Sequence, residues 1–190
     1  MPYEQSADLQ AIGIAVAERF KAFQQTTGRA IHLEVEPGKF LVINSCSVLC
    51  EVVDVINTGE QGYDFIRINS GMTEMPRVPM YGVQEPLYIL NNSNSKTDYV
   101  VIGHCCESGD LLTCKLYEAE EIEPRTLNTA STGDLMVVDG VGAYNASMSM
   151  KNYNSFPEAG ELMLRSDGSI VEIRSRQTLE QIYQNEISVV

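Results

Sequence analysis

The residues with the clearest chemical potential lie in one short stretch, Gly103 to Asp110, which reads GHCCESGD. It places the thiol of Cys106 beside the carboxylate of Glu107, directly after the apolar run Tyr99–Ile102 that is typical of a buried strand. The glycines in it indicate a loop. A thiol, whose ordinary pKa is near ~8.5, can donate a proton when its neighbours tune it. A tight turn with two half-buried structural cysteines explains the same residues, so the stretch alone leaves both interpretations open.

Four further segments carry motifs of their own. They are Glu36-Pro37-Gly38-Lys39, Gly71–Tyr81, Gly142-Ala143-Tyr144 and Tyr153-Asn154. Together with the Cys106-Glu107 stretch they resemble, in order and spacing, the family of diaminopimelate decarboxylase and its relatives, which are pyridoxal-phosphate decarboxylases with an alanine-racemase-like fold. The resemblance runs from about residue 6 to about residue 185 and concerns only the C-terminal part of that family.

The resemblance implies a catalytic role for Cys106, which would return a proton to Cα of the substrate after carbon dioxide leaves. Glu107 would bind the far end of the substrate, because a carboxylate forms strong charge-assisted hydrogen bonds with a distal ammonium group. Glutamate at this position is similar to diaminopimelate decarboxylases, whereas ornithine-type relatives carry aspartate. Cys105 is expected to be structural.

The resemblance also implies binding of pyridoxal 5′-phosphate. Glu36, Pro37, Gly38 and Lys39 match the family's Glu-Pro-Gly-Arg segment, and Tyr144 matches its tyrosine at the cofactor phosphate and the substrate. Lys39 keeps the positive charge of the family's arginine but loses its planar two-pronged contact, so binding of phosphate is expected more than bidentate binding of the substrate carboxylate. A Pro-Gly turn with a solvated lysine is the simpler alternative.

Arg77 and Tyr81 match the family's arginine and tyrosine that contact the substrate carboxylate, and the four-residue step between them is preserved. The proline of this segment has moved to Pro79, and a proline restricts the backbone of the residue before it. The family's histidine a few residues later is replaced near Glu85. Residue type alone allows a simpler interpretation, in which the Arg77 side chain lies on the surface and the Tyr81 ring lies in the core.

The family's Schiff-base lysine, and the serine and glycine-rich loop that follows it, have no counterpart here. The lysines stand at positions 21, 39, 96, 115 and 151, in surroundings unlike that motif. The expectation is a fragment that is inactive alone and requires an N-terminal barrel portion and a homodimer across the Cys-Glu stretch. In the complete enzyme it would decarboxylate a small amino acid, meso-diaminopimelate, to L-lysine. The alternatives are a related ornithine- or lysine-type decarboxylase and a non-catalytic dimerisation or regulatory β-domain.

The elements that must position these residues change character along the chain. Apolar residues at three- and four-residue steps predict a helix over 6–25 that Gly28 ends, and alternation predicts a strand over 31–35. Thr178 fits a capping box ahead of a last helix, and Asp167-Gly168 fits a hairpin turn. Short apolar or alternating runs predict strands at 49–56, 63–68, 87–90, 99–102, 111–116, 135–139, 161–164 and 170–173.

This pattern predicts a mainly β fold, a sandwich or small barrel. With the resemblance, residues 46–190 are expected to form the C-terminal β-sandwich or Greek-key barrel domain of a fold-type III pyridoxal-phosphate decarboxylase. Residues 1–45 would be the last helix and strand of its (β/α)₈ barrel. Such a remnant exposes an unpaired edge and an apolar helix face, so a partner chain is expected to cover it.

Composition excludes several other classes. The 190 residues carry a net charge of −13, spread along the chain, which repels nucleic acid and anionic lipid. The odd number of cysteines, five, and an N-terminus unlike a secretory signal predict a reducing, cytoplasmic location. The lack of Cys-x-x-Cys and the presence of only two histidines argue against a metal site. No apolar run approaches the ~20 residues of a membrane helix.

Overall fold

The computed structural model describes residues 6–189, and the chain divides into two units, Met1–Gly38 and Lys39–Val190. The first unit contains helix α1 (Leu9–Thr27), as the sequence predicted. The side chain of Asp8 accepts two amide hydrogens at its start, each at 3.0 Å, and Gly28 ends it with a φ of 71°. Both caps follow from residue type, because aspartate accepts free amides and glycine adopts the left-handed conformation without strain.

Helix α1 has no buried residue, and its large apolar side chains Leu9, Ile12, Ile14 and Phe23 are exposed. The predicted strand at 31–35 is wrong, since residues 29–37 form no regular element. Alternation of apolar residues makes a strand only where a neighbouring strand supplies hydrogen bonds, and residues 31–35 pair with none in the described chain. Within residues 6–189, none of the helices has the length and apolar character needed to cross a membrane.

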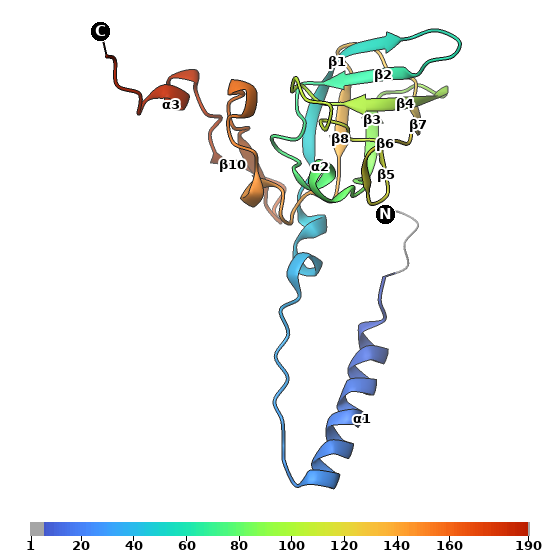
Figure 1. Ribbon diagram of the computed structural model, residues 1–190, viewed down its shortest axis with the longest axis vertical. Helices are drawn as coiled ribbons and strands as arrows, with labels where there is room; N and C mark the ends of the chain where they lie inside the picture. Colours follow the sequence, from blue (N-terminus) through green and yellow to red (C-terminus); the bar gives the residue numbers. More distant parts are fainter. Residues whose placement is uncertain (1–5, 190) are drawn as a thin grey trace. The chain divides into compact units, whose positions relative to one another are not determined.

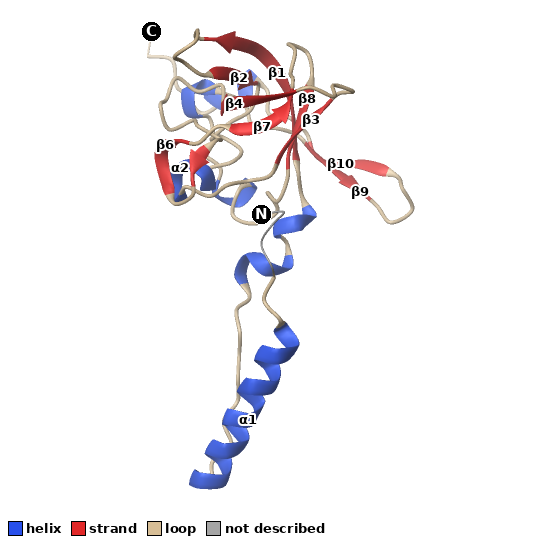
Figure 2. Ribbon diagram, turned by 90° about the vertical axis from the view of Figure 1, so that its right-hand side faces the viewer, coloured by secondary structure: helices blue, strands red, loops and turns tan. Residues whose placement is uncertain are grey.

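One six-stranded sheet dominates the second unit, in the order β3-β8-β1-β2-β4-β7 (Figure 1). Its strands are β1 (Val48–Asn57), β2 (Asp64–Ile68), β3 (Leu87–Leu90), β4 (Lys96–Ile102), β7 (Arg125–Asn128) and β8 (Leu135–Val138). The sheet curls until its two edge strands meet, where the side-chain amide of Asn128 on β7 donates to the carbonyl of Ile89 on β3 at 3.4 Å (Figure 2). The mainly β prediction is therefore confirmed, with the sheet nearly closed into a barrel.

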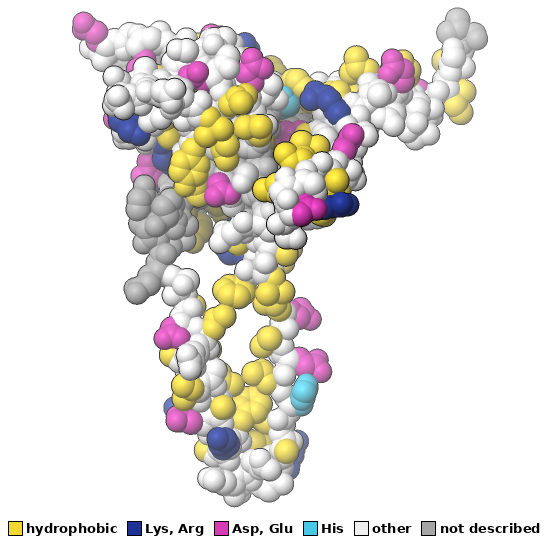
Figure 3. All heavy atoms as spheres, turned by 180° about the vertical axis from the view of Figure 1, so that it is seen from behind, with side chains coloured by type: hydrophobic (Ala, Val, Ile, Leu, Met, Phe, Trp, Pro, Cys, Tyr) yellow, Lys and Arg dark blue, Asp and Glu magenta, His cyan; other side chains and the backbone are white. Residues whose placement is uncertain are grey.

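The inside of the curled sheet is the core of this unit. Its fully buried side chains include Val52, Ile66, Ile68, Val101, Met136 and Val138. The outer face of β1, β8 and β3 carries exposed apolar residues instead, and their strands are in register, with Leu90 opposite Leu135. Apolar side chains gather on the surface of this unit in Figure 3. A contiguous exposed apolar surface is uncommon on monomers and marks a contact surface.

Smaller elements complete the unit. They are the 3₁₀ turns η1 (Gly38–Leu41), η2 (Ile43–Ser45), η3 (Ala146–Met148) and η4 (Tyr153–Ser155), the helices α2 (Arg77–Tyr81) and α3 (Leu179–Tyr183), and the strand pairs β5 (Cys114–Lys115) with β6 (Glu118–Ile122) and β9 (Glu161–Leu164) with β10 (Ile170–Arg174). The hairpin turn at Gly168 (φ 82°) and the capping box at Thr178 are confirmed. The predicted strand at 111–116 is largely wrong, because only Cys114–Lys115 is a strand there.

The order of the strands brings two distant loops together. β2 and β4 are neighbours and run parallel, whereas the other adjacent pairs of the sheet are antiparallel. A parallel pair requires a long crossover connection, and here the crossover carries α2 and β3. The segment that follows β2 and the loop that follows β4 therefore start side by side at one end of the sheet.

Candidate functional site

The Cys-Glu loop (residues 103–110) follows β4 and is closed by its own backbone. The amide of Gly103 donates to the carbonyl of Asp110 at 2.9 Å, and the amide of Asp110 donates to the carbonyl of Glu107 at 3.1 Å. The amide of His104 reaches across to the carbonyl of Ser70, after β2, at 3.1 Å. These bonds fix the loop to the end of the sheet.

Tyr153 and Asn154 hold the two central residues of this loop. The Tyr153 hydroxyl donates to Glu107 Oε2 at 3.1 Å, and the amide of Cys106 donates to Asn154 Oδ1 at 2.8 Å. The amide of Gly109 and the Tyr153 hydroxyl lower the pKa of Glu107, because both stabilise its ionised form. Glu107 raises the pKa of Tyr153 in turn. The arrangement presents an ionised carboxylate next to the exposed thiol of Cys106.

The backbone of the segment that supplies these contacts is in an uncommon conformation. Asn152, Asn154 and Ser155 have φ values of 58°, 50° and 62°. Asparagine tolerates the left-handed region better than most residues, and such backbone persists only where its surroundings impose it. The ring of Phe156 stacks on that of His104, 3.6 Å between ring centres and nearly parallel. Phe156 thereby fixes one end of the turn against the Cys-Glu loop.

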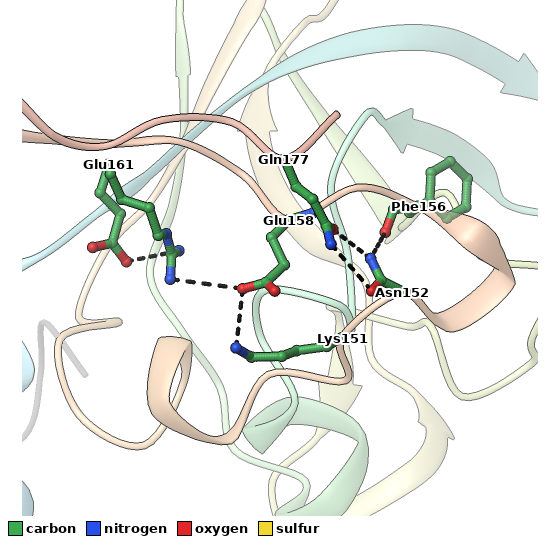
Figure 4. A network of polar contacts seen from close by, with 7 residues as sticks. Lys151, Asn152, Phe156, Glu158, Glu161 and Gln177 are labelled. Atoms are coloured by element: carbon green, nitrogen blue, oxygen red, sulfur yellow. Dashed lines mark hydrogen bonds and ion pairs between the residues drawn. The ribbon is translucent and has the colours of Figure 1, made fainter. Parts of the chain in front are cut away.

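A polar network fixes the other side of the turn (Figure 4). The side-chain amide of Asn152 donates to Gln177 Oε1 and, at 3.0 Å, to the carbonyl of Phe156. Glu158 lies 3.2 Å from Lys151 Nζ and accepts a longer contact from Arg174. The network ties the turn to the β9–β10 hairpin. The orientation of Glu107 thus depends on residues more than forty positions later in the chain.

Arg77 begins α2 and forms a buried ion pair. Its Nη1 lies 2.9 Å from Glu85 Oε1, and the two side chains are 7% and 6% exposed. Burial raises the pKa of Glu85, although the Arg77 guanidinium opposes that effect. Without the family resemblance, Arg77 was expected on the surface and Tyr81 in the core. Both expectations are wrong, because Arg77 is buried and Tyr81 is 51% exposed.

The Gly142–Tyr144 segment lies against the chain at residues 42–45. A Cβ built on Gly142 would overlap the carbonyl oxygen of Val42, and the Gly142 amide donates to the carbonyl of Ile43 at 2.9 Å. Tyr144 has a φ of 59° and is half exposed. The segment is therefore held by its backbone, which leaves the phenol ring accessible.

Glu85 links this segment to α2. The Asn145 side chain forms a hydrogen bond with Glu85 that lowers the pKa of its carboxyl, as does the charge of Lys39. The structure thus places Arg77 and Asn145 against one carboxylate, and the charge of Lys39 also acts on it. Of the remaining predicted residues, Glu36 and Pro37 lie in the irregular segment of the first unit, and Gly38 opens η1 with a φ of 56°.

Comparison with known proteins identifies the family. Residues 16–142 match the family described as "Pyridoxal-dependent decarboxylase, C-terminal sheet domain". A diaminopimelate decarboxylase of Buchnera aphidicola is 36% identical over 168 residues, which is 85% of this chain and 39% of that protein. The chain therefore spans about two fifths of the length of that curated relative.

Solved structures agree in fold. A crystal structure of diaminopimelate decarboxylase matches with a TM-score of 0.82 and 30% identity, and covers 96% of this chain and 43% of that one. The diaminopimelate decarboxylase of Helicobacter pylori, solved with L-lysine, matches with a TM-score of 0.78 and 24% identity, over 96% of this chain and 40% of that one. The chain belongs to the pyridoxal-dependent decarboxylases, of which it carries the C-terminal sheet domain.

Proposed function

We propose that this chain is the C-terminal part of a diaminopimelate decarboxylase, which converts meso-diaminopimelate to L-lysine and carbon dioxide. The observation that carries the proposal is the Cys-Glu loop, in which Tyr153 and Asn154 hold an ionised Glu107 beside the exposed thiol of Cys106. Relatives with this name match most of the chain, and the Helicobacter pylori enzyme was solved with the product of the reaction, L-lysine. A cytoplasmic location stays a prediction.

In this proposal residues 1–45 are the last piece of a (β/α)₈ barrel and residues 46–190 form the β-domain. The exposed apolar side chains of α1 and of the outer face of β1, β8 and β3 support a partner that covers them. The proposed partners are the N-terminal barrel portion and a second copy of the enzyme, which meet at the Cys-Glu loop.

Glu107 and Cys106 act on different parts of the substrate. Glu107 binds the distal ammonium group, and its ionised state suits this role because charge-assisted hydrogen bonds are the strongest. Cys106 donates its thiol proton to Cα once the carboxylate has left as carbon dioxide. Pyridoxal phosphate, when bound, supplies an electron sink for the electrons of the broken bond. Cys105 is structural in this proposal, and burial and Asp110 raise the pKa of its thiol to about 12, which makes it a weaker proton donor.

The other two anionic groups of the complex suit three of the predicted residues, Lys39, Tyr144 and Arg77. Lys39 supplies an ammonium group and Tyr144 supplies a phenol hydroxyl. The ring of Tyr144 is half exposed, so its hydroxyl is available to donate a hydrogen bond to a phosphate. Arg77 would bind the substrate carboxylate through guanidinium donors other than the one that contacts Glu85, with Tyr81 beside it. Backbone held by close contact at Gly142 keeps Tyr144 in place.

Glu107→Asp is expected to weaken the choice of diaminopimelate, because it withdraws the carboxylate by one methylene. In an enzyme assembled with the N-terminal half of a relative, discrimination against ornithine should fall by about 1–3 kcal/mol, measured as the ratio of the two kcat/KM values. Glu118→Asp is the matched control, an exposed glutamate paired with Lys115 on a different turn. Unchanged kcat/KM for both substrates in Glu107→Asp would show that Glu107 does not bind the distal group.

The chain alone is expected to bind pyridoxal phosphate weakly and to form no covalent adduct, because none of its lysines stands where the family's does. Titration with the cofactor, followed by borohydride trapping and peptide mapping, measures both properties. A full-length relative, treated in parallel, controls for the efficiency of trapping. A stoichiometric adduct on a single lysine of this chain would contradict the expectation.

A further inference from the structure

The carboxylate of Asp110 lies between two backbone segments and the residue is 3% exposed. Its Oδ1 accepts the amide hydrogen of Met72 at 2.6 Å, and its Oδ2 accepts that of Cys105 at 2.8 Å. Met72 follows β2 and Cys105 follows β4. A single side chain therefore joins the segment that leads to Arg77 with the loop that contains Cys106.

Two glycines make room for this carboxylate. A Cβ built on Gly71 or on Gly103 would overlap the Asp110 side chain. Neither glycine has a positive φ, so the need for glycine is steric and not conformational. Both backbone segments approach the carboxylate more closely than a residue with a side chain would allow.

A carboxylate is the side chain that suits this position. Burial raises the pKa of Asp110, and the amides of Cys105 and Met72 lower it because they stabilise the ionised form. An ionised carboxylate offers acceptors on both oxygens, whereas an asparagine of the same shape would turn a donor toward one of the two amides. Asparagine therefore satisfies one backbone segment and repels the other.

We infer that Asp110 is a positioning residue, which sets the backbone of Cys106 and Glu107 relative to the segment that leads to Arg77. The consequence of this positioning for decarboxylation rests on the proposed function. The contacts of Asp110 with the amides of Met72 and Cys105 do not depend on it. Cys106 directly follows the amide that Asp110 holds, and Tyr153 then holds Glu107. Without the carboxylate, the bond from the His104 amide to the Ser70 carbonyl would remain, but the amides of Met72 and Cys105 would lose their common acceptor. The backbone after Cys105 should then shift, and the contact between Glu107 and Tyr153 should weaken with it.

Nuclear magnetic resonance on the full chain tests the inference without any assay of decarboxylation. In the unaltered, isotope-labelled chain, correlations across hydrogen bonds should connect the amide nitrogens of Met72 and Cys105 to Cγ of Asp110. In Asp110→Asn, at least one of these amides should exchange with solvent about tenfold faster or more. The Cζ signal of Tyr153, which reports its bond to Glu107, should move toward its position in Glu107→Gln.

Asp167→Asn is the matched control, because Asp167 also accepts a backbone amide, that of Ser169 in the β9–β10 turn. It should leave both amides and the Tyr153 signal unchanged. The inference is overturned if the unaltered chain lacks both correlations while those of the sheet are visible, a result that needs no folded variant. It is also overturned if Asp110→Asn folds and the Tyr153 signal stays in place. An inactive assembled enzyme with these signals present would refute only the proposed function.

Discussion

Replacement of Arg77 by alanine is expected to lower the free energy of unfolding by about 3–5 kcal/mol, because it leaves the carboxylate of Glu85 buried without its charge partner. The pair is nearly inaccessible to water, and 2.9 Å separates its charged atoms. Burial raises the pKa of Glu85 even with the guanidinium present, so loss of the guanidinium should raise it further. Denaturant unfolding at pH 7, with an unchanged slope, measures the loss.

The pH dependence of this loss has a definite sign. A carboxyl whose pKa is raised in the folded state binds more protons there than in the unfolded chain, so its cost grows with pH. The loss caused by Arg77→Ala should therefore shrink as the pH falls toward ~4.3, the ordinary glutamate pKa. Repeating the unfolding series at acidic pH on both chains checks this.

Two controls distinguish the stability lost with the buried ion pair from the stability that any arginine substitution would lose. Arg67→Ala breaks an exposed pair with Asp54 at 3.8 Å and should cost at most about 1 kcal/mol. Arg77→Met combined with Glu85→Leu removes both charges, so it should recover most of the stability that Arg77→Ala loses. If Arg77→Ala costs no more than Arg67→Ala, Glu85 is not held by the guanidinium.

A mixture of a Cys106→Ala chain with a Tyr144→Phe chain is expected to restore activity that neither has alone. If the Cys-Glu loop serves the neighbouring subunit's pocket and Tyr144 serves its own, each mixed dimer has one intact site. Random exchange makes about half of the dimers mixed, so about one quarter of the sites should be intact. The measurement is decarboxylation by enzyme assembled with a family N-terminal half in trans, after heterodimers have been confirmed.

The matched control pairs two changes within one loop. Cys106→Ala mixed with Glu107→Gln leaves one defect in every site, because both residues belong to the same loop, and should restore nothing. If the mixture of Cys106→Ala with Tyr144→Phe also fails to gain over its parents, the two residues act in one pocket and the shared-site arrangement is wrong.

Features set by neighbouring residues could be predicted from the sequence. Helix α1, its end at Gly28, the hairpin turn at Gly168 and the capping box at Thr178 were all predicted and are confirmed. Each depends on contacts a few residues apart, so residue type and spacing determine it. The Cys-Glu loop was recognised for the same reason, since a buried strand followed by glycines is a local pattern.

Features that depend on partners outside the local segment were missed. The run at 31–35 alternates like a strand but has no strand to pair with, whereas Glu118–Ile122 is rich in glutamate yet pairs with β5. Helix α2 contains Pro79, which masked its helical character in the sequence. Pairing and burial decide such segments against their intrinsic preference.

The sequence by itself determined which side chains are available for chemistry, because the motif around Cys106 and Glu107 is contiguous. Only the tertiary structure decided how they are held. The parallel pairing of β2 with β4 places Met72 next to the loop that ends at Asp110, and the turn at Tyr153 reaches Glu107 from far along the chain. Strand order and burial depend on the whole core, and pairing between distant strands is not written in any single segment.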